Sequence, residues 1–323
     1  MAKASGRAHV IQGLIKYHGL KDKKRRLPFH DSISVCAERL TTTATVEFDK
    51  SYSEDRIEIN GKPAVGTEAQ RVLDVVSYVR KLAKTQEHCR LASKNNLAEG
   101  KGLGFSAAAF ASIAMAACQA LNLNLRTDRL SEVARLGAGS ASRSVAGGFA
   151  LWHANKNGRS YAEQLSSGEN IDFVMAIVPI ASSLKTDMAH AESLSSPFFK
   201  ARVKDVNKNL RLMRSAIVKG DLAKIGSLAE TDSLSLHAVT MTGKSRLFLI
   251  TPETIRIIRR IVELRDKEAI PAWFSLDTGP SVWINTRSEF VDRIAGEIKQ
   301  DMNLTVLKSG VGGPAHEVNE HLF

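Results

Sequence analysis

A glycine-rich segment early in the chain has the residue types needed to hold a phosphate group. Asn95–Phe110 reads NNLAEGKGLGFSAAAF, in which Gly100, Gly102 and Gly104 precede a run of small residues. Glycines allow successive backbone N–H groups to point at one anion, and the N-terminus of a following helix adds a positive dipole. The segment therefore predicts a phosphate-binding turn that leads into a helix at Ser106–Ala120.

Two residues of this turn are unusual for a nucleotide triphosphate site. Glu99 places a carboxylate beside the expected anion, a repulsion of about 1 kcal/mol or more when it is partly desolvated. Phe105 precedes Ser106, and its ring would fill phosphate volume without supplying a hydroxyl donor. We interpret the segment as a phosphate-binding scaffold whose nucleotide cradle is altered.

Two further segments carry a cation and a carboxylate. Gly137–Gly148 (GAGSASRSVAGG) contains Arg143, and a planar guanidinium can grip a carboxylate through two parallel hydrogen bonds. Ser275–Pro280 (SLDTGP) places Asp277 before a Gly-Pro pair, where an aspartate can act on a substrate or form the turn itself. The sequence thus offers one candidate for binding a carboxylate and one for acid–base or electrostatic chemistry.

Composition restricts the class of protein. The chain has 323 residues, 43% of them hydrophobic, which suits one large domain or two close lobes. We expect a cytoplasmic protein without a membrane partner, because no stretch reaches the length of a membrane span and the basic N-terminus lacks an apolar signal segment. Three cysteines fit neither a disulfide framework nor a metal site. No metal is expected.

The chain is basic, with a formal net charge of +11. Apart from Lys21–Arg26, the basic residues are spread along the sequence, and no aromatic-interleaved basic module accompanies them. A positive field that steers a small anionic substrate explains the charge better than nucleic acid, which is not expected as a partner.

Patterns along the chain predict mixed helices and strands without a regular βαβ series. Apolar–polar alternation predicts strands, and apolar residues at helical spacing predict helices. Expected strands are 41–48, 55–59, 89–93, 149–153, 173–180, 272–276, 281–285 and 305–307, and expected helices are 67–84, 106–120, 127–136 with Thr127 as N-cap, 198–219, 250–265 and 288–301. Residues 137–148 are expected to form a turn. We predict an α+β fold with lobes at 1–171 and 172–323.

Four segments together resemble one family. Ile15–Gly19 with Leu27–Ser34 (IKYHG…LPFHDSIS), the glycine turn, GSASRSVAGG and SLDTGP occur in the order and spacing of the mevalonate diphosphate decarboxylases, a branch of the GHMP kinase superfamily. The resemblance covers nearly the whole chain and is strongest to the archaeal-type phosphomevalonate and mevalonate 3,5-bisphosphate decarboxylases. It implies a GHMP-kinase-like two-lobe fold with a deep cleft, and a homodimer.

The resemblance implies roles for individual residues. Arg143 would hold the substrate carboxylate, Asp277 would lie near the C3 oxygen, and Lys16 would lie beside Asp277 and tune it; these three are the catalytic candidates. The implied substrate-binding residues are Tyr17, Ser106, Gly139, Ser140, Ser142, Lys185 and His190, with His30 and Asp31 near the same pocket. If the enzyme uses ATP, Gly102, Gly104 and Ser106 would bind the nucleotide.

Departures from the family pattern shape the functional expectation. Ala98 and Phe105 stand where ATP-using members have a proline and a serine, and Leu20 replaces a lysine of the enzymes that act on a C5 diphosphate. We therefore expect an ATP-independent mevalonate 3,5-bisphosphate decarboxylase, which needs no cofactor and yields isopentenyl phosphate for isoprenoid synthesis. Asp277 would then stabilise positive charge at C3.

Two alternatives remain open. If Phe105 packs into the core and the turn still holds ATP, the chain is an ATP- and Mg-dependent phosphomevalonate or diphosphomevalonate decarboxylase. A GHMP-like sensor of small molecules or a basic nucleic-acid-binding protein is the non-enzyme alternative. The presence of Lys16, Arg143 and Asp277 together favours an enzyme, because a sensor does not need all three.

Overall fold

The computed structural model describes residues 2–97, 102–181 and 186–323. Most strands of the first half, together with the last strand of the chain, form one large sheet. Its path is β14-β1-β4-β7-β5-β6, with β8 and β9 extending from β4. These strands are β1 (Ala2–Ile15), β4 (Ser32–Asp49), β5 (Arg56–Ile59), β6 (Lys62–Pro63), β7 (His88–Asn95), β8 (Phe149–Trp152), β9 (Ala162–Ser166) and β14 (His316–Val318). The last strand, β14, pairs antiparallel with β1, so the end of the chain returns to the first sheet.

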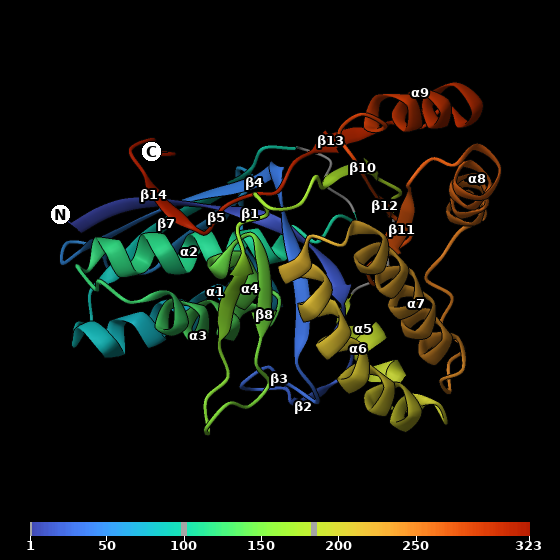
Figure 1. Ribbon diagram of the computed structural model, residues 1–323. Coiled ribbons are helices and arrows are strands. Elements are labelled where there is room, and N and C mark those ends of the chain that lie inside the picture. Colours follow the sequence, from blue (N-terminus) through green and yellow to red (C-terminus); the bar gives the residue numbers. More distant parts are fainter. Residues whose placement is uncertain (1, 98–101, 182–185) are drawn as a thin grey trace.

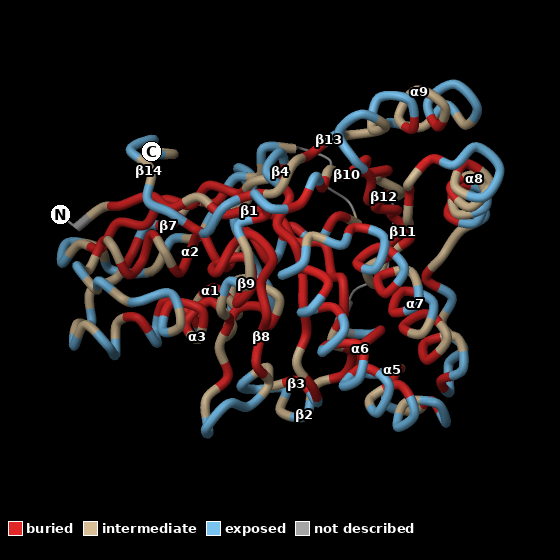
Figure 2. The backbone as a smooth tube through the Cα atoms, viewed as in Figure 1, coloured by how far each residue is buried: buried red, intermediate tan, exposed pale blue. Residues whose placement is uncertain are grey.

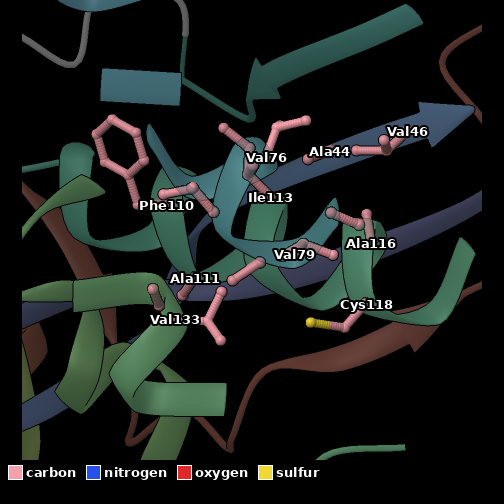
Figure 3. Packing of buried hydrophobic residues seen from close by; sticks show 14 of the residues in the cluster. Ala44, Val46, Val76, Val79, Phe110, Ala111, Ile113, Ala116, Cys118 and Val133 are labelled. Atoms are coloured by element: carbon pink, nitrogen blue, oxygen red, sulfur yellow. The ribbon is translucent and has the colours of Figure 1, made fainter. Parts of the chain in front are cut away.

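Helices cover one face of this sheet (Figure 1). They are α1 (Gly66–Ala83), α2 (Ser106–Ala120), α3 (Thr127–Gly137) and α4 (Ala141–Ala146). The alanine-rich α2 packs closely on β1 because small side chains line the contact. At Gly6 of β1 there is no room for a side chain, since a Cβ there would lie 2.8 Å from the Met115 side chain. Around α2, residues such as Val46, Val76 and Phe110 form a buried core (Figure 3). This packing fixes the N-terminal end of α2, which faces the candidate site.

The second half is built on a smaller sheet with the order β11-β12-β10-β13. Its elements are β10 (Val174–Val178), α5 (Thr186–Ser193), α6 (Phe199–Lys219), α7 (Leu222–Met241), α8 (Pro252–Glu268), β11 (Trp273–Leu276), β12 (Val282–Thr286), α9 (Val291–Met302) and β13 (Leu307–Ser309). A short hairpin of β2 (Leu20–Asp22) and β3 (Leu27–Pro28) follows β1. Figure 1 shows the two groups of elements side by side.

A hydrophobic cluster joins the two groups. Val10 and Leu14 of β1 share it with Met213 of α6 and Trp283 of β12. Figure 2 shows this continuous buried interior between the exposed helix surfaces. The expectation of an α+β fold is confirmed, while the boundary between 1–171 and 172–323 stays a prediction. Among the described residues, no helix combines the length and the apolar character needed to cross a membrane.

Several local expectations were wrong. Residues 137–148 are not simply a turn, because α4 lies within them. Thr127 is the first residue of α3 rather than its cap, and Arg126 stands at the cap position. The expectation also lacked β1 and α7. Helix α7 carries Asp232, Ser233 and His237 among its buried residues, so its apolar spacing is interrupted by buried polar side chains.

Candidate active site

One cavity lies between the two halves of the fold. Residues of the first half and of the second half line it together: Ile11, Gly13, Lys16, Tyr17, Gly104, Ser106, Ala107, Ser140, Arg143, His190, Leu236, Asp277 and Thr278. All three catalytic candidates are present, at the end of β1, in α4 and after β11. The cleft predicted between two lobes therefore corresponds to a cavity that gathers most of the predicted site residues.

Asp277 follows β11, where the strand ends at the cavity. Its Oδ1 accepts a hydrogen bond from the Gly13 N–H at 3.0 Å, and its carbonyl oxygen lies 3.0 Å from Nε2 of His237. Burial raises the pKa of the Asp277 carboxyl, although the charges of Lys16 and Arg143 and the Gly13 N–H oppose this shift. The carboxyl is thus held in place and poised for proton exchange or for facing a developing positive charge.

Lys16 comes directly after β1 and is buried. Its Nζ donates to the Oγ atoms of Ser233 and Ser275, each at 3.1 Å. Both hydroxyls use their own hydrogen elsewhere, Ser233 toward Ala229 and Ser275 toward Gly13. They are therefore acceptors for the ammonium. Burial lowers the pKa of Lys16, and Asp232 and Asp277 oppose that shift.

Arg143 lies in α4 with its guanidinium at the cavity. Nη1 donates to Ser32 Oγ at 2.5 Å, and the guanidinium carbon lies 5.5 Å from the centroid of the Tyr17 ring and 5.8 Å from that of Trp152. Burial lowers the pKa of Arg143 to about 10. Among the described residues its buried Nε has no partner, so the guanidinium retains donors for an anionic ligand.

Tyr17 and His190 line the cavity next to Arg143. Their rings stack at 4.9 Å, and Tyr17 also meets Trp152 edge-on at 4.9 Å. Nδ1 of His190 accepts the Gly19 N–H at 3.1 Å, which places the proton of a neutral ring on Nε2. A Cβ at Gly139 would lie 3.1 Å from the Tyr17 hydroxyl, so Gly139 gives the tyrosine room.

The glycine turn reaches the cavity through Gly104 and Ser106. Gly102 and Gly104 adopt φ angles of +81° and +72°, a conformation that glycine tolerates and other residues rarely adopt. Ser106 begins α2, so the helix N-terminus points to the same region. The expectation that Phe105 fills phosphate volume was wrong: the residue is 7% exposed, packs in the cluster with Val10 and Leu14, and is not among the residues that line the cavity.

Of the remaining predicted residues, some line the cavity and others do not. Ser140 lines the cavity, whereas Ser142 is fully buried and is not among the lining residues. His30 and Asp31 also lie outside the lining; Asp31 accepts the Ala154 N–H at 2.7 Å. Lys185, like Glu99 and Ala98 of the turn, falls outside the described residues. The substrate contacts assigned to these residues stay predictions.

The sequence interpretation missed the residues that surround Lys16. Asp232, Arg202, Ser233 and Ser275 are all buried, and each contacts Lys16 or a partner of it. Ser275 begins the SLDTGP segment, two residues before Asp277. One feature of the sequence indicates that Asp232 and Arg202 are buried: each is a charged residue on the otherwise apolar face of a long helix.

Comparison with known proteins identifies the family. Residues 8–162 match the model of the diphosphomevalonate decarboxylase-like N-terminal domain, and residues 182–316 match that of the mevalonate 5-diphosphate decarboxylase C-terminal domain. The phosphomevalonate decarboxylase of Haloferax volcanii is 40% identical over 321 residues, covering 98% of each chain. This chain belongs to the diphosphomevalonate decarboxylase family. It is a decarboxylase that acts on a phosphorylated mevalonate.

Solved structures of the family have the same fold, which confirms the expected GHMP-kinase-like two-lobe fold. The crystal structure of mevalonate diphosphate decarboxylase from Staphylococcus aureus aligns with a TM-score of 0.92 at 28% identity, covering 98% of both chains. A structure of the Enterococcus faecalis enzyme, which concerns ATP binding mediated by mevalonate diphosphate, aligns with a TM-score of 0.89 at 28% identity, covering 98% of this chain and 99% of the other. Within the described part of this decarboxylase, no group of three or more His, Cys, Asp or Glu is arranged to hold a metal ion.

Proposed function

We propose that this decarboxylase acts on mevalonate 5-phosphate and consumes ATP, giving isopentenyl phosphate, CO2, ADP and phosphate. The observation that carries the proposal is the position of Phe105, whose ring packs in the core while Gly104 and Ser106 line the cavity. The main steric argument against a nucleotide, based on the sequence, therefore does not apply. The name of the Haloferax volcanii relative, phosphomevalonate decarboxylase, supports the same substrate.

The residues of the turn fit a phosphate chain. Gly102 and Gly104 have the positive φ angles that allow backbone N–H groups to converge on an anion, and the N-terminus of α2 adds its dipole. ATP, when bound, supplies the phosphoryl group that turns the C3 hydroxyl into a leaving group. Asp277 would accept the proton of that hydroxyl, Lys16 would balance the charge of Asp277, and Arg143 would orient the carboxylate that leaves as CO2.

The monophosphate at C5 is supported by Leu20. This residue lies in β2 directly after Gly19. The family resemblance places a lysine at this position in the enzymes that act on a C5 diphosphate. Its apolar side chain cannot pair with a second phosphate. We therefore expect a lower KM for mevalonate 5-phosphate than for mevalonate 5-diphosphate.

A second candidate is the ATP-independent decarboxylation of mevalonate 3,5-bisphosphate, the function expected from the sequence. One observation favours it: Phe105 removes a hydroxyl donor from the turn, wherever its ring lies. Here the C3 phosphate is already present, so Asp277 would have no proton to accept and would instead face the positive charge that develops at C3.

Two parallel assays separate these functions. CO2 release is measured with ATP and Mg from mevalonate 5-phosphate or, for comparison, mevalonate 5-diphosphate, and with EDTA and without ATP from mevalonate 3,5-bisphosphate. We expect turnover in the first assay, with one ADP formed per CO2. Turnover in the second assay alone would overturn the proposal in favour of the ATP-independent enzyme, and turnover with the 5-diphosphate alone would overturn the monophosphate assignment.

A further inference from the structure

A buried carboxylate and a buried guanidinium from two helices meet at Lys16. Asp232 lies in α7 and Arg202 in α6, and their exposed fractions are 1% and 4%. Nη2 of Arg202 donates to Oδ1 of Asp232 at 3.0 Å. Charges this deeply buried are costly unless they are paired and hydrogen-bonded. Here both side chains contact Lys16, the residue that directly follows β1.

The pair binds both main-chain polar groups of Lys16. Oδ2 of Asp232 accepts the Lys16 N–H at 2.9 Å, and Nη2 of Arg202 donates to the Lys16 carbonyl oxygen at 2.9 Å. Nη1 of Arg202 also donates to the carbonyl oxygen of Asp232 at 3.2 Å. The backbone of Lys16, which extends from the first sheet, is thus fastened at two points to helices of the second half.

The same carboxylate faces the ammonium without a direct hydrogen bond. Lys16 Nζ lies 3.7 Å from Oδ2 of Asp232, while it donates to Ser233 and Ser275 at 3.1 Å. An ammonium has three N–H donors, and the third has no hydrogen-bond partner among the described residues. Lys16 lines the cavity beside Asp277, so the arrangement leaves one donor for the cavity.

We propose that Asp232 and Arg202 are positioning residues for Lys16, which hold its main chain and its ammonium in the geometry that the decarboxylation requires. Neither residue is among those lining the cavity, so each acts through Lys16. The inference rests on the decarboxylase activity and is independent of whether ATP is consumed.

Charge gives the two residues opposite effects on Lys16. The groups facing its ammonium are Asp232 and His237 of α7, Arg202 of α6, Asp277 after β11 and Arg143 of α4. Asp232 raises the pKa of Lys16, and Arg202 lowers it. Asp232→Asn should therefore lower the pKa of Lys16, and Arg202→Met should raise it. Opposite shifts would show that both charges act on the Lys16 ammonium, and a loss of kcat in the folded variants would show that the geometry they impose on Lys16 matters for turnover.

The test measures the Lys16 titration directly and through activity. Protein labelled with ¹³C at the lysine ε-carbon is titrated by NMR, with the Lys16 signal assigned from Lys16→Met. The pH profile of kcat/KM is recorded for the same variants. We expect the alkaline limb and the Lys16 midpoint to move to lower pH in D232N and to higher pH in R202M, with kcat reduced about 10-fold to 100-fold in each.

A matched control exists elsewhere in the fold. Asp55 likewise accepts from an arginine, Arg80, and from a backbone N–H, that of Cys89 at 2.8 Å, but neither Arg80 nor Cys89 lines the cavity. Asp55→Asn should lower the stability and leave the Lys16 titration and the pH profile unchanged. Shifts in the same direction for D232N and R202M, or no shift in either, would overturn the proposal.

A variant that fails to fold does not end the test. In R202M/D232N the buried carboxylate and guanidinium are removed together, and Lys16 keeps the charge of Asp277 and the hydroxyls of Ser233 and Ser275 as partners; replacing a buried pair in this way is often tolerated. We expect this double variant to fold and to lose kcat, because the main chain of Lys16 has lost its guanidinium donor. Wild-type kcat in the folded double variant would overturn the proposal. Because the NMR titration needs no turnover, failure of the proposed function and failure of this inference give different results.

Discussion

Arg143 and Ser32 are joined inside the cavity wall by a hydrogen bond of 2.5 Å from Nη1 to Oγ. Ser32 starts β4 and is fully buried, so it has one rigid position. The bond fixes the plane of the guanidinium, whose rotation is further limited by the rings of Tyr17 and Trp152. A fixed plane is what two parallel bonds to a carboxylate need.

Removing the Ser32 hydroxyl should weaken substrate binding. A hydrogen bond to a charged group contributes about 1.5–3 kcal/mol, so Ser32→Ala should raise KM or lower kcat/KM by about 10-fold to 100-fold. Arg143→Lys, which loses the planar fork, should cost at least as much. Steady-state kinetics measures both. Ser131→Ala is the control, because Ser131 is equally buried and hydrogen-bonded but its partners, Asp128 and Ala162, do not line the cavity; an equal loss of kcat/KM there would contradict the assignment.

Asp277 should matter for turnover more than for binding. Asp277→Asn keeps an oxygen to accept the Gly13 N–H but cannot take a proton or carry negative charge. We expect kcat to fall by about 100-fold or more, with the substrate Kd changed little. Isothermal titration and single-turnover assays separate the two quantities. An unchanged kcat would show that Asp277 only forms the turn before Gly279 and Pro280.

Much of this site could be predicted from local sequence. The helix at Ser106–Ala120 has the predicted bounds, because glycines before it and alanines within it act locally. Arg143 and Asp277 stood out through their glycine- and proline-containing neighbours. Asp232 and Arg202 could not be predicted in this way, since they meet Lys16 across 216 and 186 positions of sequence. Such contacts arise from tertiary packing, which no local pattern encodes.

At Phe105, by contrast, the local sequence predicted a contact that the structure does not have. Its position beside Ser106 suggested a side chain in the phosphate volume, yet adjacent residues at a helix start point in different directions. Phe105 directs its ring into the core, and Ser106 faces the cavity. Sequence adjacency to a functional serine therefore says little about where a side chain lies.

Substituting Phe105 should affect stability far more than nucleotide binding. Truncating a buried phenylalanine to alanine costs about 3–5 kcal/mol, and Phe105→Leu should cost less because most of the volume is kept. Urea unfolding measures this difference. In the proposed ATP-dependent reaction, the KM for ATP should change less than about threefold in F105L. A large change in that KM with an unchanged unfolding midpoint would show that the ring contacts nucleotide.

The three cysteines should be unreactive in the folded protein. Cys36, Cys89 and Cys118 are buried, and burial raises the pKa of each thiol to about 12. Because the thiolate is the reacting species, an aromatic disulfide reagent should label them only as the protein unfolds. The rate of labelling near pH 8 then follows the opening of the structure. Fast labelling of one cysteine in native buffer would contradict this burial.

His153 should make stability depend on pH in a defined direction. Its Nε2 lies 2.9 Å from Glu163 Oε1 and its Nδ1 lies 3.4 Å from Asp31 Oδ2. Although burial lowers the pKa of His153, hydrogen bonds to Asp31 and Glu163 outweigh it and raise the pKa above its ordinary value. A raised folded-state pKa gives a stabilisation that is fully present below the unfolded-state pKa, about 6.5, and is lost as pH rises through the folded-state pKa.

Comparison with His153→Gln isolates this contribution from the other histidines. His9, His18, His30 and His237 are buried with lowered pKa values, so protonating them destabilises the fold at low pH in both proteins. The difference in unfolding free energy between wild type and H153Q should therefore be largest near pH 6 and shrink toward pH 9. Urea midpoints at several pH values measure it. A difference that grows with pH would mean that His153 is held neutral between its two carboxylates.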